Sequence, residues 1–216
     1  MRLRIKFPTR GRSIKFFDVL DKYVDYLDDK ENYEIIVSCD KDDKDMNNKN
    51  VISKLKTYKN LKYYFGDNNS KIEAINTNME GDFDIVLLAS DDMIPQVQGY
   101  DSIIRMNMKK YYPDTDGVLW FFDGYRRDLN TLCILGKKYY DRFNYIYNPE
   151  YKSFWCDNEF MQVGNMLGKQ KFIDVCVIKH DHPDINGQAY DETYIKNNFS
   201  GDEIVFRNRL SKNFNL

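Results

Sequence analysis

The chain has 216 residues, a formal net charge of −2 and 42% hydrophobic residues, with 17 tyrosines among its aromatic residues. A chain of this length can bury a core as one domain, and its charge excludes a generally basic protein that coats nucleic acid. No apolar run approaches the roughly 20 residues of a membrane-spanning helix, so we expect no membrane partner. The N-terminus has no signal-peptide core and no CxxC pair is present, so we expect a reducing, cytoplasmic location.

Apolar segments of strand type alternate with amphipathic segments in the first half of the sequence. We expect strands over residues 2–7, 34–39, 61–65 and 83–89. We expect helices over residues 13–27, 50–58 and 71–79. This alternation, repeated four times, predicts right-handed βαβ units and a parallel sheet.

The second half of the sequence is more mixed. Its predicted helices cover residues 96–112, 136–143, 157–167 and a charged tail at 191–210. Its predicted strands cover residues 116–122, 132–135 and 172–179. No repeat or linker divides the chain. We therefore predict one α/β domain with a mixed, mostly parallel sheet flanked by helices: a nucleotide-binding half (1–95), an acceptor or catalytic half (96–190) and a C-terminal helical tail (191–216).

The fourth predicted strand ends on two adjacent carboxylates, Asp91 and Asp92. A continuous apolar run is typical of a strand buried on both faces, and ligands of open α/β sheets bind at the carboxyl ends of strands. Two carboxylates placed there repel each other unless a cation lies between them. The pair therefore indicates a divalent metal site, and the alternative is that it caps a turn.

Groups that could bind the same ligand follow the other three predicted strands of the first half. They are Pro8, Thr9, Arg10 and Arg12 after the first strand, Asp40 after the second, and Asn68 and Lys71 after the third. Acidic side chains can accept hydrogen bonds from a ribose or a base, and Arg and Lys can neutralise diphosphate oxygens. No GxGxxG or GxxxxGK[ST] motif is present, which argues against a dinucleotide-dependent dehydrogenase and a P-loop NTPase.

The order of these motifs resembles the GT-A-fold glycosyltransferases, especially family 2-like enzymes and small phage or viral members. The resemblance rests on Phe7 to Arg12, on the acidic end of the strand at Asp40, and on Ser90-Asp91-Asp92, which stands where that fold has its metal-binding DxD motif. It implies a nucleotide-sugar donor, which we expect to be UDP-linked, and a divalent metal, Mn²⁺ or Mg²⁺. For a phage or viral enzyme, the resemblance also implies a location in the host cytoplasm.

The resemblance also implies roles for later residues. Asp157 and Glu159 stand in a segment similar to the one that supplies the catalytic base of inverting members, and Asp157 is favoured. His180 and His182 stand where some members have a late metal ligand. The resulting metal ligands are Asp92, Asp91, His180 and His182. Donor contacts are expected from the strand-end groups and from Ser90, Asp91, Asp123 and Gly124.

Elementary chemistry is consistent with these roles. An acceptor hydroxyl must lose its proton as it attacks, and a carboxylate can take that proton. Asp157 and Glu159 open a predicted helix, whose dipole stabilises anions, and their i, i+2 spacing turns them to different faces. An imidazole ligand favours Mn²⁺ over Mg²⁺.

A second DxD at Asp114-Thr115-Asp116 precedes a strand, and we predict that it forms a turn.

We therefore expect a metal-dependent glycosyltransferase that acts on an acceptor hydroxyl with inversion. The alternatives are a sugar-phosphate nucleotidyltransferase and a non-catalytic nucleotide- or carbohydrate-binding module of the same fold. The sequence leaves the acceptor open among a glycan, a protein and a modified DNA base.

Overall fold

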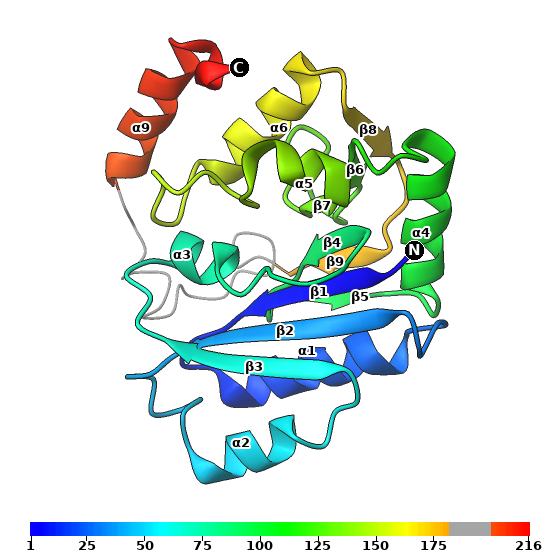
Figure 1. Ribbon diagram of the computed structural model, residues 1–216, viewed down its shortest axis with the longest axis vertical. Helices are drawn as coiled ribbons and strands as arrows, with labels where there is room; N and C mark the ends of the chain where they lie inside the picture. The colour runs from blue at the N-terminus through cyan, green and yellow to red at the C-terminus, as the bar shows by residue number, and fades with distance from the viewer. Residues whose placement is uncertain (182–199) are drawn as a thin grey trace.

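The computed structural model describes residues 1–181 and 200–216. Its centre is a seven-stranded sheet with the order β3-β2-β1-β4-β7-β6-β8 (Figure 1). The strands are β1 (Leu3–Pro8), β2 (Tyr33–Asp40), β3 (Leu61–Gly66), β4 (Ile85–Leu88), β6 (Val118–Phe121), β7 (Ile134–Gly136) and β8 (Gln170–Ile173). The first four are parallel, and β7 runs antiparallel to both β4 and β6. The predicted mixed, mostly parallel α/β sheet is confirmed.

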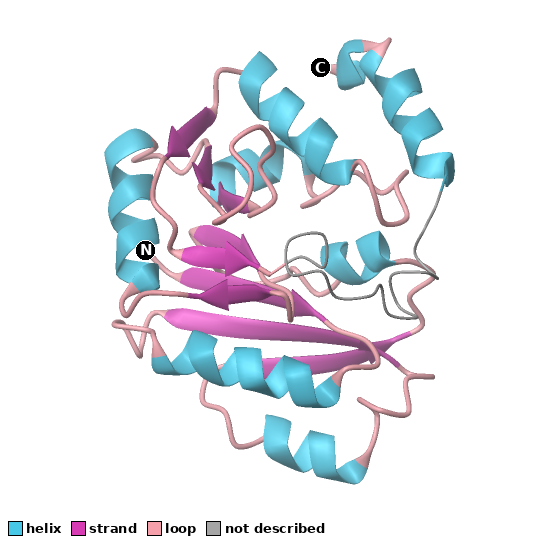
Figure 2. Ribbon diagram, turned by 180° about the vertical axis from the view of Figure 1, so that it is seen from behind, coloured by secondary structure: helices cyan, strands magenta, loops and turns pink. Residues whose placement is uncertain are grey.

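Helices cover both faces of this sheet (Figures 1 and 2). One face packs against α1 (Ser13–Asp25), α2 (Lys49–Leu55) and α4 (Tyr100–Tyr111). The other packs against α3 (Lys71–Asn76), α5 (Lys137–Phe143), α6 (Cys156–Met166) and α9 (Ser200–Leu210), which a short 3₁₀ turn, η1 (Asn213–Asn215), follows. Each face thus has its own apolar core. None of the helices in the described ranges is long and apolar enough to span a bilayer.

The strand β1 is buried on both faces although it alternates apolar and basic residues. Arg4 is buried beside Glu34, with Nη2 2.7 Å from Oε1, and its guanidinium lies over the ring of Phe83. Lys6 donates to the carbonyl of Thr77 at 2.6 Å, and burial lowers the pKa of Lys6 to about 7. Two cations are therefore held inside the domain by specific partners.

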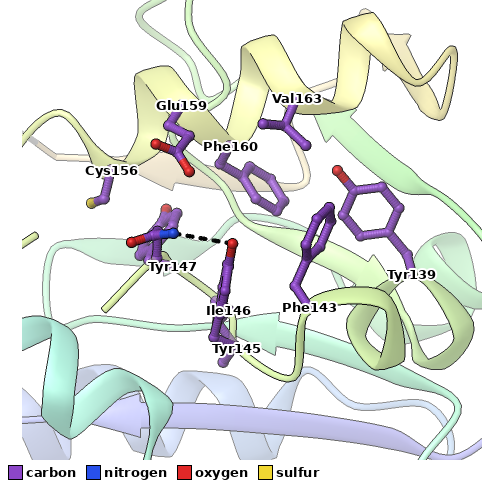
Figure 3. A pocket seen from close by; sticks show the side chains of 10 residues that line it. Tyr139, Phe143, Tyr145, Ile146, Tyr147, Cys156, Glu159, Phe160 and Val163 are labelled. Carbon is purple, nitrogen blue, oxygen red and sulfur yellow. Dashed lines mark hydrogen bonds between the residues drawn. The ribbon is translucent and has the colours of Figure 1, made fainter. Parts of the chain in front are cut away.

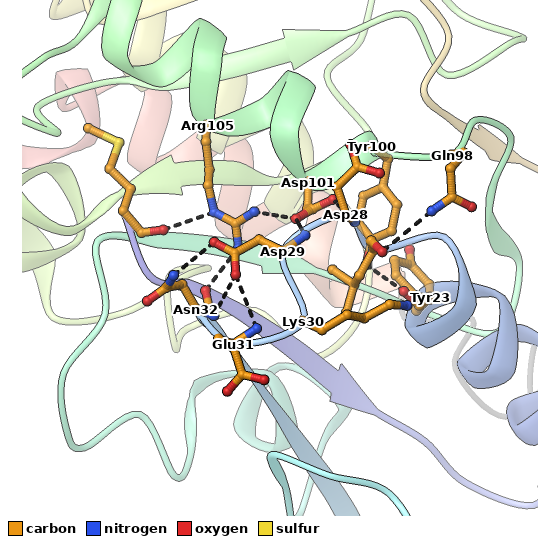
Figure 4. A network of polar contacts seen from close by, with 12 residues as sticks. Tyr23, Asp28, Asp29, Lys30, Glu31, Asn32, Gln98, Tyr100, Asp101 and Arg105 are labelled. Atoms are coloured by element: carbon orange, nitrogen blue, oxygen red, sulfur yellow. Dashed lines mark hydrogen bonds and ion pairs between the residues drawn. The ribbon is translucent and has the colours of Figure 1, made fainter.

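Helix α4 holds the edge of the sheet at which strands β1 and β2 begin (Figure 4). Asp101 is fully buried and accepts hydrogen bonds from the backbone N–H groups of Asp28 (2.9 Å) and Asp29 (3.2 Å). Arg105 pairs with Asp101 and donates to the carbonyl of Met1 at 2.9 Å. This network ties the turn before β2 and the start of the chain to α4, and it leaves the carboxyl edge of the sheet for other groups.

Two predicted elements differ from the structure. The single strand expected at 172–179 is wrong: β8 ends at Ile173, and a separate strand, β9 (Ile178–His180), begins after an exposed bend. β9 pairs antiparallel with β5 (Met93–Pro95), which the sequence did not predict. The helix expected from residue 96 begins at Tyr100, because Gly99 takes φ +75° where it meets the Asp28 side chain.

The predicted C-terminal helix is described only in part. Its described portion is α9, which begins at Ser200, and the earlier residues of the predicted tail lie outside the described ranges.

Candidate active site

The carboxyl ends of β1, β2 and β4 lie side by side at one edge of the sheet. In the parallel pairing of β1 with β2, Pro8 lies opposite Ser38. In the parallel pairing of β1 with β4, Lys6 lies opposite Leu88. The loops that follow these strands therefore leave the sheet together, as the sequence predicted.

The loops after β1 and β2 are joined through Asp40. Arg10 Nη1 lies 2.6 Å from Asp40 Oδ2, and Asn68 Nδ2 donates to Asp40 Oδ1 at 2.8 Å. Arg10 also pairs with Asp42, and the hydrogen bonds that Arg10 donates to Asp42 and Asp40 raise the pKa of Arg10. The backbone N–H of Thr9 donates to Ser38, inside the same edge. These contacts bring together four of the residues predicted to contact a donor: Thr9, Arg10, Asp40 and Asn68.

Cations gather around the carboxylate of Asp91. Arg12 Nε lies 3.1 Å from Asp91 Oδ2, and Asp91 is only 5% exposed. Burial raises the pKa of Asp91, while the charges of Arg12, Lys15 and Lys71 act in the opposite sense. Lys15 lies in the first turn of α1, and the sequence interpretation missed it. The sequence feature that could have indicated Lys15 is its position three residues after Arg12, in the first turn of the predicted helix.

Asp92 and His180 face each other although they come from distant parts of the chain. His180 Nε2 lies 3.7 Å from Asp92 Oδ2, and the Ser90 hydroxyl donates to Asp92 Oδ1. Burial acts to raise the pKa of Asp92, but His180 and Ser90 outweigh it and hold that pKa well below its usual range. The backbone N–H of Asp181 also donates to the Asp92 carbonyl at 2.7 Å. The β5–β9 pair therefore fixes this contact.

The structure places Asp123 beside His180. Asp123 Oδ2 lies 3.9 Å from His180 Nδ1 and accepts the Thr131 hydroxyl at 2.6 Å. Asp123 Oδ1 accepts the backbone N–H groups of residues 125 and 126. Gly124 takes φ +83° in this turn, against the side chain of Lys179. Both oxygens of Asp123 thus accept hydrogen bonds from residues of the same loop, and its contact with a donor stays a prediction.

A divalent metal fits this arrangement only if a substrate shares it. Asp92 and His180 offer one carboxylate and one imidazole, a set that suits Mn²⁺. Within residues 1–181 and 200–216, no three His, Cys, Asp or Glu side chains are grouped so as to hold a metal ion. Hard cations are commonly held by one or two carboxylates together with substrate phosphates and water. The predicted ligand His182 lies outside the described residues.

Asp157 lies in the first turn of α6, two residues after a residue in an unusual conformation. Trp155 has φ +62°, and the Asp157 carboxylate accepts the Asn158 N–H at 2.9 Å. Burial raises the pKa of Asp157, and Lys71 opposes this rise. Lys71 acts in the same sense on Asp91 and Asp92. The charge of Lys71 therefore acts on all three carboxylates, one at the start of α6 and two after β4.

Glu159 points away from that site into the interior (Figure 3). Its Oε2 accepts hydrogen bonds from the Tyr151 hydroxyl and from Arg209 Nε, both at 2.7 Å. It lines a cavity of about 20 Å³ together with Tyr147 and Phe160, which is room for about one water molecule. The predicted division of the two acidic residues between different helix faces is seen in these contacts. They do not support the alternative that Glu159 is the base.

The second DxD motif forms a turn, as predicted. Thr115 takes φ +61°, and the backbone N–H of Asp116 donates to Asp114 Oδ1. Lys138 pairs with Asp114 at 2.7 Å, and Arg142 pairs with Asp116 at 2.7 Å. Both carboxylates are engaged by local cations at the far end of β7.

No protein-family model matches the sequence, and no curated protein matches it. The structure resembles the mannosyltransferase PcManGT from Pyrobaculum calidifontis in complex with GDP-Man and Mn²⁺, with a TM-score of 0.63 and 14% identity over 81% of this chain and 55% of that chain. It also resembles S. aureus TarS in complex with UDP-GlcNAc, with a TM-score of 0.63 and 16% identity over 91% of this chain and 64% of that chain.

A third similar structure is the 4-diphosphocytidyl-2C-methyl-D-erythritol synthase from Anaerococcus prevotii, with a TM-score of 0.56 and 13% identity over 85% of this chain and 92% of that chain. The chain thus spans about half to two thirds of the length of the two glycosyltransferase structures. Identities this low establish the fold alone. The chain has the GT-A-type fold of these nucleotide-sugar enzymes.

Proposed function

We propose that this protein transfers a sugar from a nucleoside-diphosphate sugar to an acceptor hydroxyl, with inversion at the anomeric carbon. The observation that carries the proposal is a pair of contacts at one sheet edge, Arg12 with Asp91 and His180 with Asp92. The charge of Lys71, which acts on both of these carboxylates and on Asp157, supports adding Asp157 to the same site. The likeness to structures that hold GDP-Man and UDP-GlcNAc supports it.

The donor would lie across the ends of β1, β2 and β4. Arg12 and Lys71 are the cations positioned to bind its diphosphate. Asp40, held by Arg10 and Asn68, lies at the end of the neighbouring strand, where its carboxylate can accept hydrogen bonds from a ribose or base. A UDP-linked donor is our first choice for the test.

Asp92 and His180 would hold a divalent cation, Mn²⁺ in preference to Mg²⁺. When bound, such a cation stabilises negative charge on a leaving diphosphate. Ser90 supports this arrangement because its hydroxyl fixes the orientation of the Asp92 carboxylate.

Asp157 acts as the general base in the proposed reaction. It takes the proton of the acceptor hydroxyl while the hydroxyl oxygen bonds to the anomeric carbon and the bond from that carbon to the diphosphate oxygen breaks. Burial raises the pKa of Asp157, which strengthens the carboxylate as a base. Its place at the start of α6 limits that rise, since a helix N-terminus favours an anion.

The test is a screen of UDP- and GDP-sugars with Mn²⁺ or Mg²⁺, with glycan, protein and modified-DNA acceptors, measuring released nucleoside diphosphate. We expect metal-dependent release that falls roughly 100-fold or more in Asp92→Asn and in Asp157→Asn. The matched control is Asp114→Asn, which alters the other DxD motif and should keep full activity.

Other outcomes of this screen would overturn the proposal. Release of pyrophosphate from a sugar phosphate and a nucleoside triphosphate would indicate nucleotidyl transfer instead. Tight metal-dependent nucleotide binding without turnover would indicate a binding module. Full activity in Asp92→Asn would also exclude the proposed site.

A further inference from the structure

We infer that Asp202 of α9 is a positioning residue that holds the segment before α6 and thereby sets the position of Asp157. The inference rests on the proposed function for its catalytic consequence. Its structural basis is independent of that function, because it consists of contacts between α9 and the chain just before Asp157.

Asp202 is an internal acceptor for three consecutive backbone N–H groups. It is 1% exposed. Its Oδ1 accepts from Lys152 at 2.9 Å, and its Oδ2 accepts from Ser153 and Phe154, each at 2.8 Å. A carboxylate that accepts several backbone donors is strongly held, and donors left without it in the interior would be costly. Asp202 therefore fixes the path of residues 152–154.

That path leads directly into a strained turn. Trp155 has φ +62°, a conformation that is rare for a bulky side chain and persists only where the surroundings enforce it. Phe206, one turn further along α9, packs on Trp155 with ring centroids 5.1 Å apart. α9 thus holds both the backbone before Trp155 and its side chain. The next two residues begin α6 and include Asp157.

The same segment also contacts the donor side of the site. The carbonyl of Lys152 accepts the backbone N–H of Ile72 at 3.3 Å. Ile72 follows Lys71, the residue whose charge acts on Asp157. Residues 152–154 therefore connect α9 to the start of α3 on one side and to the start of α6 on the other. A change in their path would alter the spacing between Lys71 and Asp157.

A second contact holds α9 against the other side of the turn. Arg209 is 7% exposed and binds Glu159 through two hydrogen bonds, Nε to Oε2 at 2.7 Å and Nη2 to Oε1 at 3.0 Å. Glu159 lies two residues after Asp157. Figure 1 shows α9 beside α6. Asp202 lies in the first turn of α9 and Arg209 in its last. The chain is therefore held by α9 on both sides of Asp157.

The test compares Asp202→Asn with Glu203→Gln. Asn keeps the size of Asp but has one acceptor oxygen, and its NH₂ group would face a backbone N–H. Glu203 is the adjacent residue; it is partly exposed, and among the described residues it pairs with Arg207 of its own helix. Glu203→Gln therefore makes the same chemical change outside the contact. Both variants are assayed far below their melting temperatures.

We expect Asp202→Asn to lower kcat about 10-fold or more while the KM of the donor stays within twofold, because a 1 Å displacement of a catalytic group is costly. The acidic limb of its kcat profile should move to lower pH, because Asp157 loses burial. Backbone amides of residues 152–154 should exchange hydrogen faster. Glu203→Gln should match the wild type in its kcat and KM, in its pH profile and in its amide exchange.

A merely structural role would lower the melting temperature of Asp202→Asn and leave kcat and its pH profile unchanged, and this result would overturn the inference. If Asp202→Asn does not fold, Arg209→Lys, which loses the two-point contact, takes its place with the same expectations. If the wild-type protein turns over no donor, the proposed function fails. The amide exchange and the pKa of Asp157, measured by NMR, still decide whether Asp202 positions this segment.

Discussion

The guanidinium of Arg12 lies against the carboxylate of Asp91, with Nε 3.1 Å from Oδ2. Arg12 follows β1 and Asp91 follows β4, and these strands are neighbours in the sheet. Asp91 is buried, whereas the Arg12 side chain is 24% exposed. An arriving anion therefore meets the cation of this pair before it meets the carboxylate.

Replacing Arg12 should weaken binding of the donor more than it slows the reaction. In Arg12→Gln we expect the affinity for a nucleoside diphosphate with Mn²⁺ to fall roughly 10-fold or more, because a charge-assisted hydrogen bond contributes about 1.5–3 kcal/mol. Titration calorimetry measures this affinity. Arg2→Gln, at the amino edge of the sheet, is the control. Unchanged affinity in Arg12→Gln would remove Arg12 from the donor site.

Asp157 should give the reaction an acidic limb above the ordinary range of a carboxyl group. Burial raises the pKa of Asp157, and the charge of Lys71 opposes this rise. The charge of Asp157 in turn helps to raise the pKa of Arg126. A base is active when deprotonated, so kcat/KM should fall as pH drops through this raised pKa. Asp157→Asn should lose about 10²- to 10⁴-fold in kcat together with this limb.

Steady-state rates between pH 4 and pH 8 check this prediction. Asp141→Asn, an exposed residue of α5 paired with Lys137, is the control. If Asp157→Asn keeps the same acidic limb, another group is the base.

Lys6 should make the stability of the domain depend on pH near neutrality. Burial lowers the pKa of Lys6 to about 7 in the folded state, from 10.5 in the unfolded chain. Between these values the unfolded chain binds the extra proton, so the free energy of unfolding rises with pH. Relative to Lys6→Met, the wild type should gain on the order of 2 kcal/mol from pH 7 to pH 9.

Urea unfolding of both proteins at the two pH values measures this difference, and taking the difference cancels the shared titration of buried Tyr and Cys groups. Lys56→Met, on the surface, should show no such pH-dependent difference. A pH-independent difference between the wild type and Lys6→Met would mean that Lys6 stays charged in the folded state.

Breaking the buried ion pair of Arg4 and Glu34 should be strongly destabilising. Arg4 is 1% exposed, and Glu34 also binds Lys62 at 2.6 Å. Glu34→Gln leaves the buried guanidinium without a counter-charge, which typically costs about 3–5 kcal/mol. Glu31→Gln removes an exposed pair with Lys59 and should cost less than about 1 kcal/mol. Equal losses in the two variants, measured by urea unfolding, would contradict the prediction.

The sequence was sufficient for the parts of the site that follow from sheet geometry. Arg12, Asp40 and Asp92 each follow a predicted strand, and parallel pairing must bring such strand ends to one edge. The sequence was not sufficient for β5 and β9, because three-residue strands have too few positions to show a period. The contact of His180 with Asp92 depends on that pairing, so only the family resemblance indicated it.

The same limit applies to the side chains that support the site. An acidic residue in the first turn of a helix is expected from the helix dipole alone, so Asp202 gave no signal that it would accept hydrogen bonds from residues 152–154. Likewise, the i, i+2 spacing of Asp157 and Glu159 predicted opposite directions for the two carboxylates. It could not identify Arg209 as the partner of Glu159, because that contact is set by packing between distant helices.

The pairing of β5 with β9 also decides when in synthesis the site can form. β5 is made in the first half of the chain, directly after Asp92, but its partner strand ends at His180. Contacts between residues far apart in sequence form slowly, and domains fold as their chain emerges from the ribosome. A nascent chain that has reached β7 already has the strand ends carrying Arg12 and Asp40. It lacks the residue that faces Asp92, so the Asp92–His180 contact forms only after β9 has been made.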